Sequence, residues 1–223
     1  MRFRSLNESA IPMKLKIDFH VHTRFSYDAH TRPELLPEII SRRGLDGVAL
    51  AEHDNLPRVE VKDALVIPGM EISTADGHLI ALGVSRQISR GSSASQTVIE
   101  VKRLGGVTII PHPYDYFSPS INPANLRVKP DAIETINASV IFFGKAKQKA
   151  ERTAQELSLP TVGGSDSHIP ETVGDAYTIV DSDSTSIEDV LLAVKEGRVK
   201  PYGKATSLWN RLRKSTLDIK RKI

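Results

Sequence analysis

The sequence predicts an α/β fold built on a mostly parallel barrel or sheet. Short apolar strand signals alternate along the chain with amphipathic helix signals, which is the pattern of βα units. Potential metal-binding residues recur where the predicted strands end, and such folds place their chemistry at the carboxyl ends of the strands. At 223 residues, the chain is long enough for one such domain with extensions.

The first predicted strand ends in two histidines that point the same way. Leu15 to Phe19 is an apolar run, and residues 18–22 read Asp-Phe-His-Val-His. Side chains alternate across a strand, so Asp18, His20 and His22 share one face. Two imidazoles on a rigid element favour a metal ion, but a lone His-x-His pair is weak evidence.

A helix and a second strand repeat this arrangement. The helix is predicted from Thr31, its N-cap, to about Arg43, and Gly44 ends it. Residues 48–51 form a second buried strand, which runs directly into Glu52-His53-Asp54. Titratable groups again stand where a strand ends.

The third strand signal covers about residues 65–72 and carries Glu71 near its exit. Ala75-Asp76-Gly77 predicts a tight turn that leads into an apolar return strand at 79–84. A hairpin at this turn would bring His78 close to Glu71.

The second half of the chain contains two more predicted strands that are followed by potential metal ligands. Helices are predicted at about 92–104, 140–157 and 186–196, and strands at 107–110, 132–136, 159–162 and 177–180. The strand at 107–110 ends in Pro111-His112-Pro113, whose prolines stiffen the histidine backbone. The strand at 159–162 is broken by Gly163-Gly164 and delivers Asp166 and His168. The irregular segment 114–130 is expected to be a loop over the site.

The recurrence of these residues, more than any one of them, indicates a metal centre. A single histidine after a strand is more often hydrogen-bonded or exposed, and a single glutamate is more often a solvated acid. Here six of the seven histidines lie at or beside a predicted strand end. The candidate ligands exceed the three or four that one catalytic ion takes, so we infer two or three divalent ions. Mixed nitrogen and oxygen ligands suit Zn, Mn or Fe.

Composition excludes several other kinds of site and location. The chain has no cysteine, so disulfides and thiolate ligands are excluded and any metal must be held by His, Asp and Glu. No stretch approaches the roughly 20 apolar residues of a membrane span. Residues 1–12 also lack the apolar core of a signal peptide. We therefore expect a soluble, cytoplasmic protein.

The positive charge of the chain is concentrated in its C-terminal tail. The formal net charge is +3, whereas residues 204–223 carry seven Lys or Arg against one acid. Leu208, Trp209 and Leu212 follow helical spacing, so we expect a helix that packs on the domain with a solvated basic face. Alternatively, these cations contact nucleic acid and steer it toward the metals. The expected segments are a disordered leader (1–13), one barrel domain (14–203) and this tail (204–223).

In their order along the chain, these motifs resemble those of the PHP (polymerase and histidinol phosphatase) superfamily of metal-dependent phosphoesterases. The matching segments, spread over about residues 14–200, are Asp18-Phe19-His20-Val21-His22, Glu52-His53-Asp54, Glu71, His112-Pro113 and Gly164-Ser165-Asp166-Ser167-His168. The resemblance implies a distorted (β/α)7 TIM-like barrel with a trinuclear metal centre at the C-terminal ends of the strands.

The resemblance also implies a distribution of ligands over the three ions. The first ion would be held by His20, His22, Glu71 and Asp166. Glu71 would bridge to a second ion, bound by His112 and His78. The third ion would be held by His53 and His168. Behind the ligands, the resemblance places the supporting acids Asp18, Glu52 and Asp54.

Asp28 is a further candidate ligand, at a position where some family members have a histidine. A carboxylate there favours Mn, Fe or Mg at the third site. It also favours the branch that resembles nucleotide and oligonucleotide phosphoesterases.

The predicted activity is hydrolysis of phosphomonoesters or phosphodiesters by a metal-activated water, with no protein nucleophile. The substrates expected are nucleotides or short oligonucleotides, as for a 5′-3′ exonuclease or a nucleoside bisphosphate phosphatase, although a sugar phosphate presents the same phosphoryl group. Arg86, Arg90 and Lys145 are candidates for an extra phosphate contact. Two alternatives stay open: a metal-dependent amidohydrolase, and a non-catalytic PHP-like accessory protein that binds nucleic acid.

Overall fold

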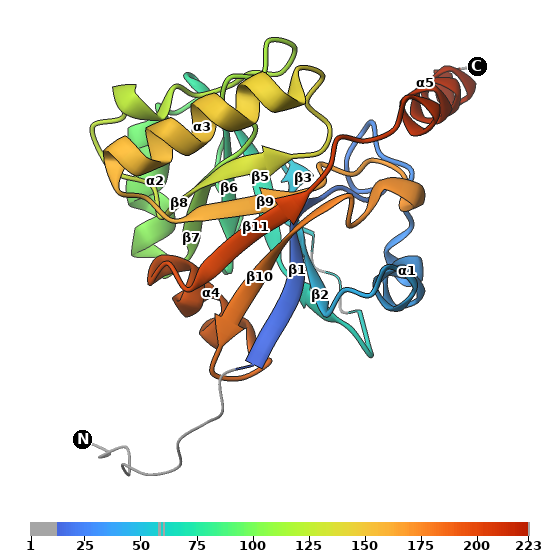
Figure 1. The fold of residues 1–223 in the computed structure, drawn as a ribbon, viewed down its shortest axis with the longest axis horizontal. Helices are drawn as coiled ribbons and strands as arrows, with labels where there is room; N and C mark the ends of the chain where they lie inside the picture. Colours follow the sequence, from blue (N-terminus) through green and yellow to red (C-terminus); the bar gives the residue numbers. More distant parts are fainter. Residues whose placement is uncertain (1–12, 58, 60, 223) are drawn as a thin grey trace.

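The computed structural model describes residues 13–57, 59 and 61–222, and it shows strands arranged in two sheets with helices packed around them (Figure 1). One sheet has the order β11-β10-β1-β2-β4. Its strands are β1 (Met13–Val21), β2 (Gly47–Leu50), β4 (Leu65–Ile67), β10 (Ala176–Ser182) and β11 (Val199–Gly203). Apart from Met13, the predicted leader lies outside the described residues.

The second sheet has the order β3-β5-β6-β7-β8-β9. Its strands are β3 (Glu52–His53), β5 (Gly69–Thr74), β6 (Gly77–Leu82), β7 (Val107–Ile110), β8 (Ala132–Asn137) and β9 (Thr161–Gly164). The helices are α1 (Leu36–Arg43), α2 (Ala94–Arg103), α3 (Phe143–Leu157), α4 (Ile187–Lys195) and α5 (Leu208–Lys222), with short 3-10 turns at Pro33–Leu35, Pro123–Asn125 and Pro170–Thr172.

The two sheets meet at the end of β1. The amide of Ala51, between β2 and β3, donates to the carbonyl of Val21, and the amide of His22 donates to the carbonyl of Ser167 after β9. Parallel pairs join β1 to β2, β2 to β4, β3 to β5, β7 to β8 and β8 to β9. The α/β class is therefore confirmed, whereas closure into a (β/α)7 barrel stays a prediction.

A buried core holds β1 in place beneath the site. Ile17 and Phe19 are almost fully buried in the largest apolar cluster, together with Ile80 and Ile109. Burying a side chain such as that of Phe19 contributes about 1.5–3 kcal/mol. The histidines that follow Phe19 thus project from a strand that is already fixed by packing.

Glycine and proline explain two places where the strands differ from the prediction. The strand expected at 65–72 is divided at Pro68, which has no amide proton for a ladder hydrogen bond. Gly163 and Gly164 lie inside β9, so the expectation that they break the strand is wrong. A Cβ on Gly164 would lie 2.4 Å from the His20 Cβ and 2.5 Å from Glu134 Oε1. Glycine there allows close approach of β9 to the site.

The C-terminal tail is helical, as predicted, but it docks by an unexpected face. Its apolar side chains Leu208, Trp209, Leu212 and Ile219 are 61–79 % exposed. The guanidinium of Arg211 instead donates to the carbonyls of Ala138 and Ser139, and that of Arg221 donates to the carbonyl of Ala29. The expectation of a solvated basic face therefore holds only in part: Arg213, Lys220 and Arg221 are exposed, whereas Arg211 and Lys214 are half-buried, because this end of the domain offers carbonyl and carboxylate acceptors.

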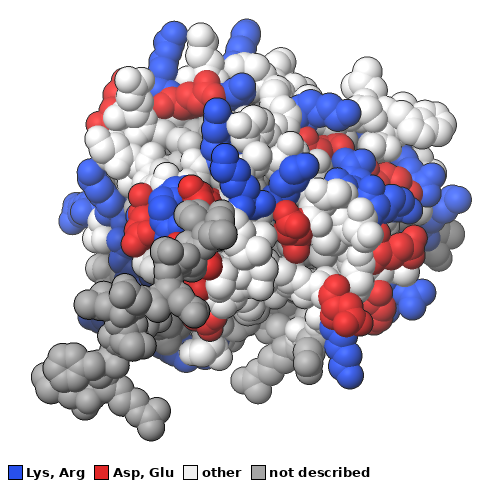
Figure 2. Space-filling model, turned by 60° about the horizontal axis from the view of Figure 1, so that its bottom comes forward, with Lys and Arg blue, Asp and Glu red and all other residues white. Residues whose placement is uncertain are grey.

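Charges are mixed on the face turned forward in Figure 2, where Lys and Arg side chains alternate with Asp and Glu. This face therefore does not present a continuous field of one sign to a polyanion. Within the described part of the chain, no helix combines the length and the apolar character needed to cross a membrane.

Candidate metal centre

All nine predicted metal ligands meet at the end of the domain where β1, β3, β5, β7 and β9 deliver their carboxyl-terminal residues. They are His20, His22, Asp28, His53, Glu71, His78, His112, Asp166 and His168. Seven of them line a cavity of 340 Å³. Three groups of potential ligand atoms, each with its atoms within 4.8 Å of one another, overlap through His22 and Glu71.

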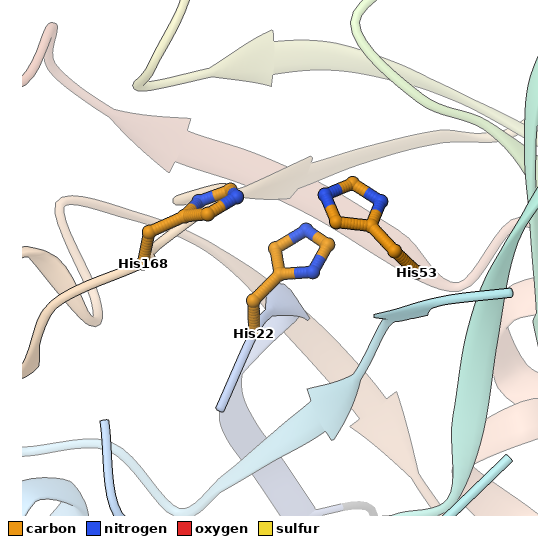
Figure 3. Close-up of side chains that lie close together, drawn as sticks. All are labelled: His22, His53 and His168. Atoms are coloured by element: carbon orange, nitrogen blue, oxygen red, sulfur yellow. The ribbon is translucent and has the colours of Figure 1, made fainter. Parts of the chain in front are cut away.

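One group consists of three imidazoles from different parts of the chain. The rings of His22, His53 and His168 converge on a common space (Figure 3). The centroid of the His22 ring lies 4.4 Å from that of His53 and 4.3 Å from that of His168. Asp28 borders this group, with its Oδ2 atom 3.2 Å from His168 Nε2 and its Oδ1 atom 3.5 Å from His53 Nε2. The third predicted ion therefore has His22 as an additional neighbour.

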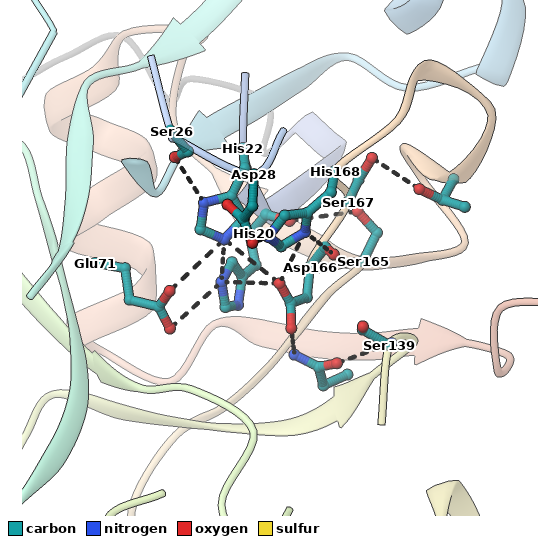
Figure 4. A network of polar contacts seen from close by, with 12 residues as sticks. His20, His22, Ser26, Asp28, Glu71, Ser139, Ser165, Asp166, Ser167 and His168 are labelled. Carbon is teal, nitrogen blue, oxygen red and sulfur yellow. Dashed lines mark hydrogen bonds and ion pairs between the residues drawn. The ribbon is translucent and has the colours of Figure 1, made fainter. Parts of the chain in front are cut away.

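A second group joins the HxH pair to Glu71, and the carboxylate of Asp166 lies beside it. Figure 4 shows Glu71 and Asp166 on either side of His20 and His22. The Nε2 atom of His20 lies 3.7 Å from Glu71 Oε1 and 3.6 Å from Asp166 Oδ1. The Nε2 atom of His22 lies 3.6 Å from Glu71 Oε2 and 3.4 Å from Asp166 Oδ1. These four side chains are the set expected for the first ion.

The third group lies on the other side of Glu71. His112 Nε2 is 2.9 Å and His78 Nδ1 is 3.1 Å from Glu71 Oε1. The predicted hairpin produces the second contact, because β5 and β6 pair antiparallel with Thr74 opposite Gly77. Glu71 thus faces all three groups, with Oε1 toward His78 and His112 and Oε2 toward His22 and His53, an arrangement that suits a bridging carboxylate.

Hydrogen bonds behind the rings fix which nitrogen of each histidine faces the centre. His20 Nδ1 lies 3.2 Å from Glu134 Oε1, and a carboxylate only accepts, so Nδ1 carries a proton and the neutral ring presents the Nε2 lone pair to the centre. Similarly, His168 Nδ1 donates to the carbonyl of Asp166 at 3.0 Å. The neutral ring then presents the Nε2 lone pair to the Asp28 carboxylate at 3.2 Å. Two acceptors at this separation repel each other unless a cation lies between them.

His22 shows the same arrangement. Ser26 Oγ donates to Glu52 Oε2 at 2.6 Å and can therefore accept from His22 Nδ1, which lies 3.2 Å away. When both rings are neutral, the Nε2 lone pairs of His20 and His22 face each other at 3.1 Å. This donor set fits divalent metal ions, because several nitrogen and oxygen lone pairs converge without enough protons to satisfy them.

Two buried polar atoms among the described residues support this fit. Asp28 Oδ1 and His78 Nδ1 are shielded from solvent and lack a hydrogen bond of acceptable geometry, although both face ligand residues. Buried polar atoms without partners are costly. Both atoms would gain a partner from an ion in the space that they border.

The carboxylates of the cluster favour positive charge on His20, whereas burial and the other histidines disfavour it on His22. Burial disfavours a charged His20, yet the carboxylates of Asp166, Glu134 and Glu71 raise its pKa well above the ordinary value. Burial, followed by the influence of His168 and of the other nearby histidines, lowers the pKa of His22 to about 3. Although burial opposes ionisation of Glu71, its histidine neighbours, led by His20, hold its pKa well below the ordinary value.

The three predicted supporting acids have different surroundings. Asp18 accepts the backbone amides of His20, Ser165 and Gly174, so it ties the first strand to the segment that carries Asp166. Glu52 acts on His22 only through Ser26. Asp54 contacts none of the nine ligands by a side-chain bond; it accepts the amide of Ser73 at 2.7 Å.

Glu134 is a functional position that sequence reasoning missed. Its carboxylate contacts His20 Nδ1 and accepts the amide of His112 at 2.7 Å, so it orients two predicted ligands. Asn137 donates to Glu134 at 2.8 Å. Glu134 lies inside the predicted strand at 132–136, with no motif that distinguishes it from an ordinary core-strand residue. An acid within an otherwise apolar strand was the only available signal.

The structure places the two arginines predicted to contact phosphate outside the metal cavity. Arg86 pairs with Glu100 at 3.1 Å, and Arg90 lies 3.7 Å from Asp54; both are largely exposed. Neither residue lines the metal cavity, and exposed Lys145 at the start of α3 does not line it either. Lys214 of α5 lines it instead, with Nζ 3.9 Å from Asp28 Oδ2. Lys214 was missed because the tail was treated as a separate segment.

Comparison with known proteins gives one family match and several similar folds. The model of the PHP-associated family matches residues 144–199. An uncharacterised protein of Methanocaldococcus jannaschii is 28 % identical over 141 residues, which cover 56 % of this chain and 82 % of that protein.

Two solved structures share the fold at low sequence identity. One is a two-domain protein from Bacteroides vulgatus containing a predicted PHP-like metal-dependent phosphoesterase, with a TM-score of 0.68, 22 % identity, and coverage of 91 % of this chain and 70 % of that one. The other is the lesion-specific endonuclease Q from Pyrococcus furiosus, with a TM-score of 0.61, 15 % identity, and coverage of 85 % and 58 %.

Proposed function

We propose that the chain is a PHP-type phosphoesterase, whose strand-end cluster hydrolyses phosphoester bonds with the help of two or three divalent metal ions; the match of the PHP-associated family to residues 144–199 supports this. The observation that carries this proposal is the set of histidine lone pairs and carboxylates that face one another at 3–4 Å with their outer hydrogen bonds already formed. Burying these groups without metal would lower the stability of the fold, whereas the same groups are well suited to bind several metal ions.

Each side of the cluster has a distinct part in holding the ions. The first ion would be held by His20, His22, Glu71 and Asp166. A second ion would share Glu71 and be held by His78 and His112. A third ion would be held by His53, His168 and Asp28. Ions bound there would supply an activated water and neutralise the charge that develops on the phosphoryl oxygens. The mixed donors suit Mn, Fe or Zn, and the carboxylate of Asp28 also admits Mg.

The protein itself supplies positioning around the phosphoryl group. Glu134 holds the His20 ring and the His112 backbone, and Asp18 holds the backbone next to Asp166. Lys214 projects into the cavity, where its ammonium group would contact a phosphoryl oxygen. No serine, threonine or cysteine nucleophile is needed for this hydrolysis, and the proposal assigns none.

The substrate class proposed is a nucleotide or a short oligonucleotide. Asp28 favours that branch of the superfamily, and the similar fold of an endonuclease supports it. The exonuclease or bisphosphate phosphatase type of activity follows from the same resemblance. A sugar phosphate offers the same phosphoryl group and is the natural comparison in an assay.

The proposal is tested with a substrate panel and a matched metal series. The full chain, loaded with Mn, Fe or Zn, is assayed on nucleoside mono- and bisphosphates, ribose 5-phosphate, 5′-phosphorylated RNA and DNA, and amide and lactone substrates. We expect metal-dependent release of phosphate or nucleotides that is lost in Asp166→Asn. Turnover of amides or lactones without phosphoester hydrolysis would identify an amidohydrolase, and metal-free nucleic-acid binding without turnover would identify an accessory protein.

A further inference from the structure

A group of exposed aromatic side chains at the mouth of the metal cavity has no role in holding the metals. Tyr27, Tyr116, Phe117 and Phe142 are 47–80 % exposed, in a chain that is only 5 % aromatic. Tyr27 and Phe117 line the cavity itself. Tyr27 also stacks on candidate ligand His53, with ring centroids 5.3 Å apart. Large exposed rings gathered beside a polar site indicate ligand binding more than folding.

Phe117 is held in a fixed relation to the metal ligands. In its loop, Ser120 Oγ lies 2.9 Å from the carbonyl oxygen of His112 and 3.4 Å from its Nδ1 atom. The carbonyl of neighbouring Pro119 accepts the amide of His78 at 2.9 Å. The loop that carries Phe117 is therefore tied to two candidate ligands of the second ion.

The aromatic rings also support one another. Phe117 lies nearly parallel to Phe142, with an interplanar angle of 29° and centroids 6.2 Å apart. Tyr116 meets Phe142 edge to face, with an angle of 85° and a centroid distance of 6.0 Å. Phe142 stands at the N-cap position of α3, so a regular helix backs the group. Together these contacts present Phe117 as a supported flat surface beside the cavity.

Resting on the proposed phosphoesterase function, we propose that Phe117, backed by Phe142, is a stacking surface for the nucleobase attached to the phosphate at the metal centre. A purine or pyrimidine offers a flat π-face that stacks on an aromatic ring, whereas a sugar phosphate has none. Lys214 lines the same cavity and suits the phosphate of the same ligand. The site thus selects nucleotides, free or at the 5′ end of a strand, over sugar phosphates.

The test compares variants that keep or remove the ring at position 117. Phe117→Ala removes the side chain, Phe117→Leu keeps apolar volume without a π-face, and Phe117→Trp keeps a ring. Trp209→Ala removes an exposed ring on α5 that does not line the cavity. Binding of 2-aminopurine riboside 5′-monophosphate, and of an oligonucleotide with that base at its phosphorylated 5′ end, is followed by stopped-flow fluorescence before turnover. The kcat/KM for ribose 5-phosphate is measured in parallel.

Stacking predicts that Phe117→Ala and Phe117→Leu weaken binding of the 2-aminopurine ligands about 5- to 100-fold. Phe117→Trp and Trp209→Ala should bind as the unmodified protein does. The kcat/KM for ribose 5-phosphate should not change in any variant. If both 2-aminopurine ligands bind more weakly to these variants, the stacking site accepts any nucleotide. If only the oligonucleotide binds more weakly, the site is specific for the 5′ ends of strands.

Two results would overturn the stacking proposal. Normal binding by Phe117→Leu would show that apolar volume suffices, and equal losses on ribose 5-phosphate and nucleotides would show that Phe117 only stiffens its loop. In either case, metal-dependent phosphoester hydrolysis by the unmodified protein would leave the proposed function intact. Conversely, ring-dependent binding without hydrolysis of any phosphoester would sustain the stacking site and reject the phosphoesterase.

Discussion

The floor of the metal cavity consists of buried side chains at strand ends, whereas its rim consists of exposed side chains on α5 and on the loop after β7. Floor residues such as His20 and Glu71 are nearly inaccessible to solvent and contact several other candidate ligands. Rim residues such as Lys214 and Phe117 are partly or largely exposed: Lys214 pairs with Asp218 and approaches Asp28, and Phe117 packs against Phe142. If the chain has the proposed function, we expect the floor to determine whether hydrolysis occurs and the rim to determine which substrate is bound.

The largest effects are expected on the floor. Asp166→Asn and His22→Ala should each lower phosphoesterase turnover at least about a hundredfold, because loss of a ligand misplaces the ion that stabilises phosphoryl charge. Steady-state kinetics on the best phosphoester from the panel measure the effect. Circular dichroism of each variant checks that it is folded. Near wild-type turnover in either folded variant would place the chemistry elsewhere.

Glu134→Gln should have an intermediate effect, because Glu134 orients the floor from behind. Removing its charge weakens its contacts with His20 and the His112 amide, and comparable changes behind metal ligands cost about 10- to 100-fold in metal affinity or activity. Metal affinity is measured by competition with a chromogenic chelator. Glu151→Gln, an exposed position on α3, is the control. Equal metal affinity in both variants would remove the positioning role.

A smaller effect is expected on the rim. Lys214→Ala should raise KM for phosphoesters by roughly 3- to 10-fold with little change in kcat, because a partly exposed ammonium contributes a modest charge-assisted contact. Lys145→Ala changes an exposed lysine outside the cavity and should have no effect. The same KM change in both variants would show that general surface charge, rather than Lys214, attracts the substrate.

The difference between floor and rim also explains what the sequence could reveal. His20, His22, Glu71 and Asp166 were recognisable because strand periodicity and the order of polar residues after apolar runs determine where they lie, whereas Asp28 was proposed only from the resemblance to the PHP superfamily. Strand β11 escaped prediction because Pro201 interrupts a short, weakly apolar segment. The docking face of α5 escaped it because helical spacing predicts only an apolar stripe, not which backbone acceptors lie opposite. Glu134 and Phe117 gain their roles from distant contacts that no local pattern contains.

The smallest expected effect concerns the stability of the metal-free floor at different pH values. His20, His53 and His112 have raised pKa values because neighbouring carboxylates outweigh the burial that opposes their protonation. The folded state therefore keeps protons that the unfolded chain releases above the ordinary pKa of 6.5. Chelated protein should thus gain stability as the pH falls from about 9 to 6.5 and show a rise in Tm of about 2–4 °C for each kcal/mol.

The lowered pKa of His22, about 3, sets the limit of this gain. Below pH 6.5, the unfolded chain protonates His22 before the folded protein does, so further acidification costs stability. Metal-loaded protein should show the opposite trend between pH 9 and 6.5, because protons compete with the ions for the same nitrogens. Thermal melts with and without chelator distinguish the two states, and parallel trends would argue against shared proton and metal sites.

The most direct test of the account is the number of metal ions that the purified protein carries. Cells are grown with ample Mn, Fe and Zn, the full chain is purified without chelator, and its metals are counted by elemental analysis against protein concentration. The overlapping ligand groups around His22 and Glu71 predict two or three ions per chain. Fewer than one ion per chain under these conditions would contradict a polynuclear metal centre.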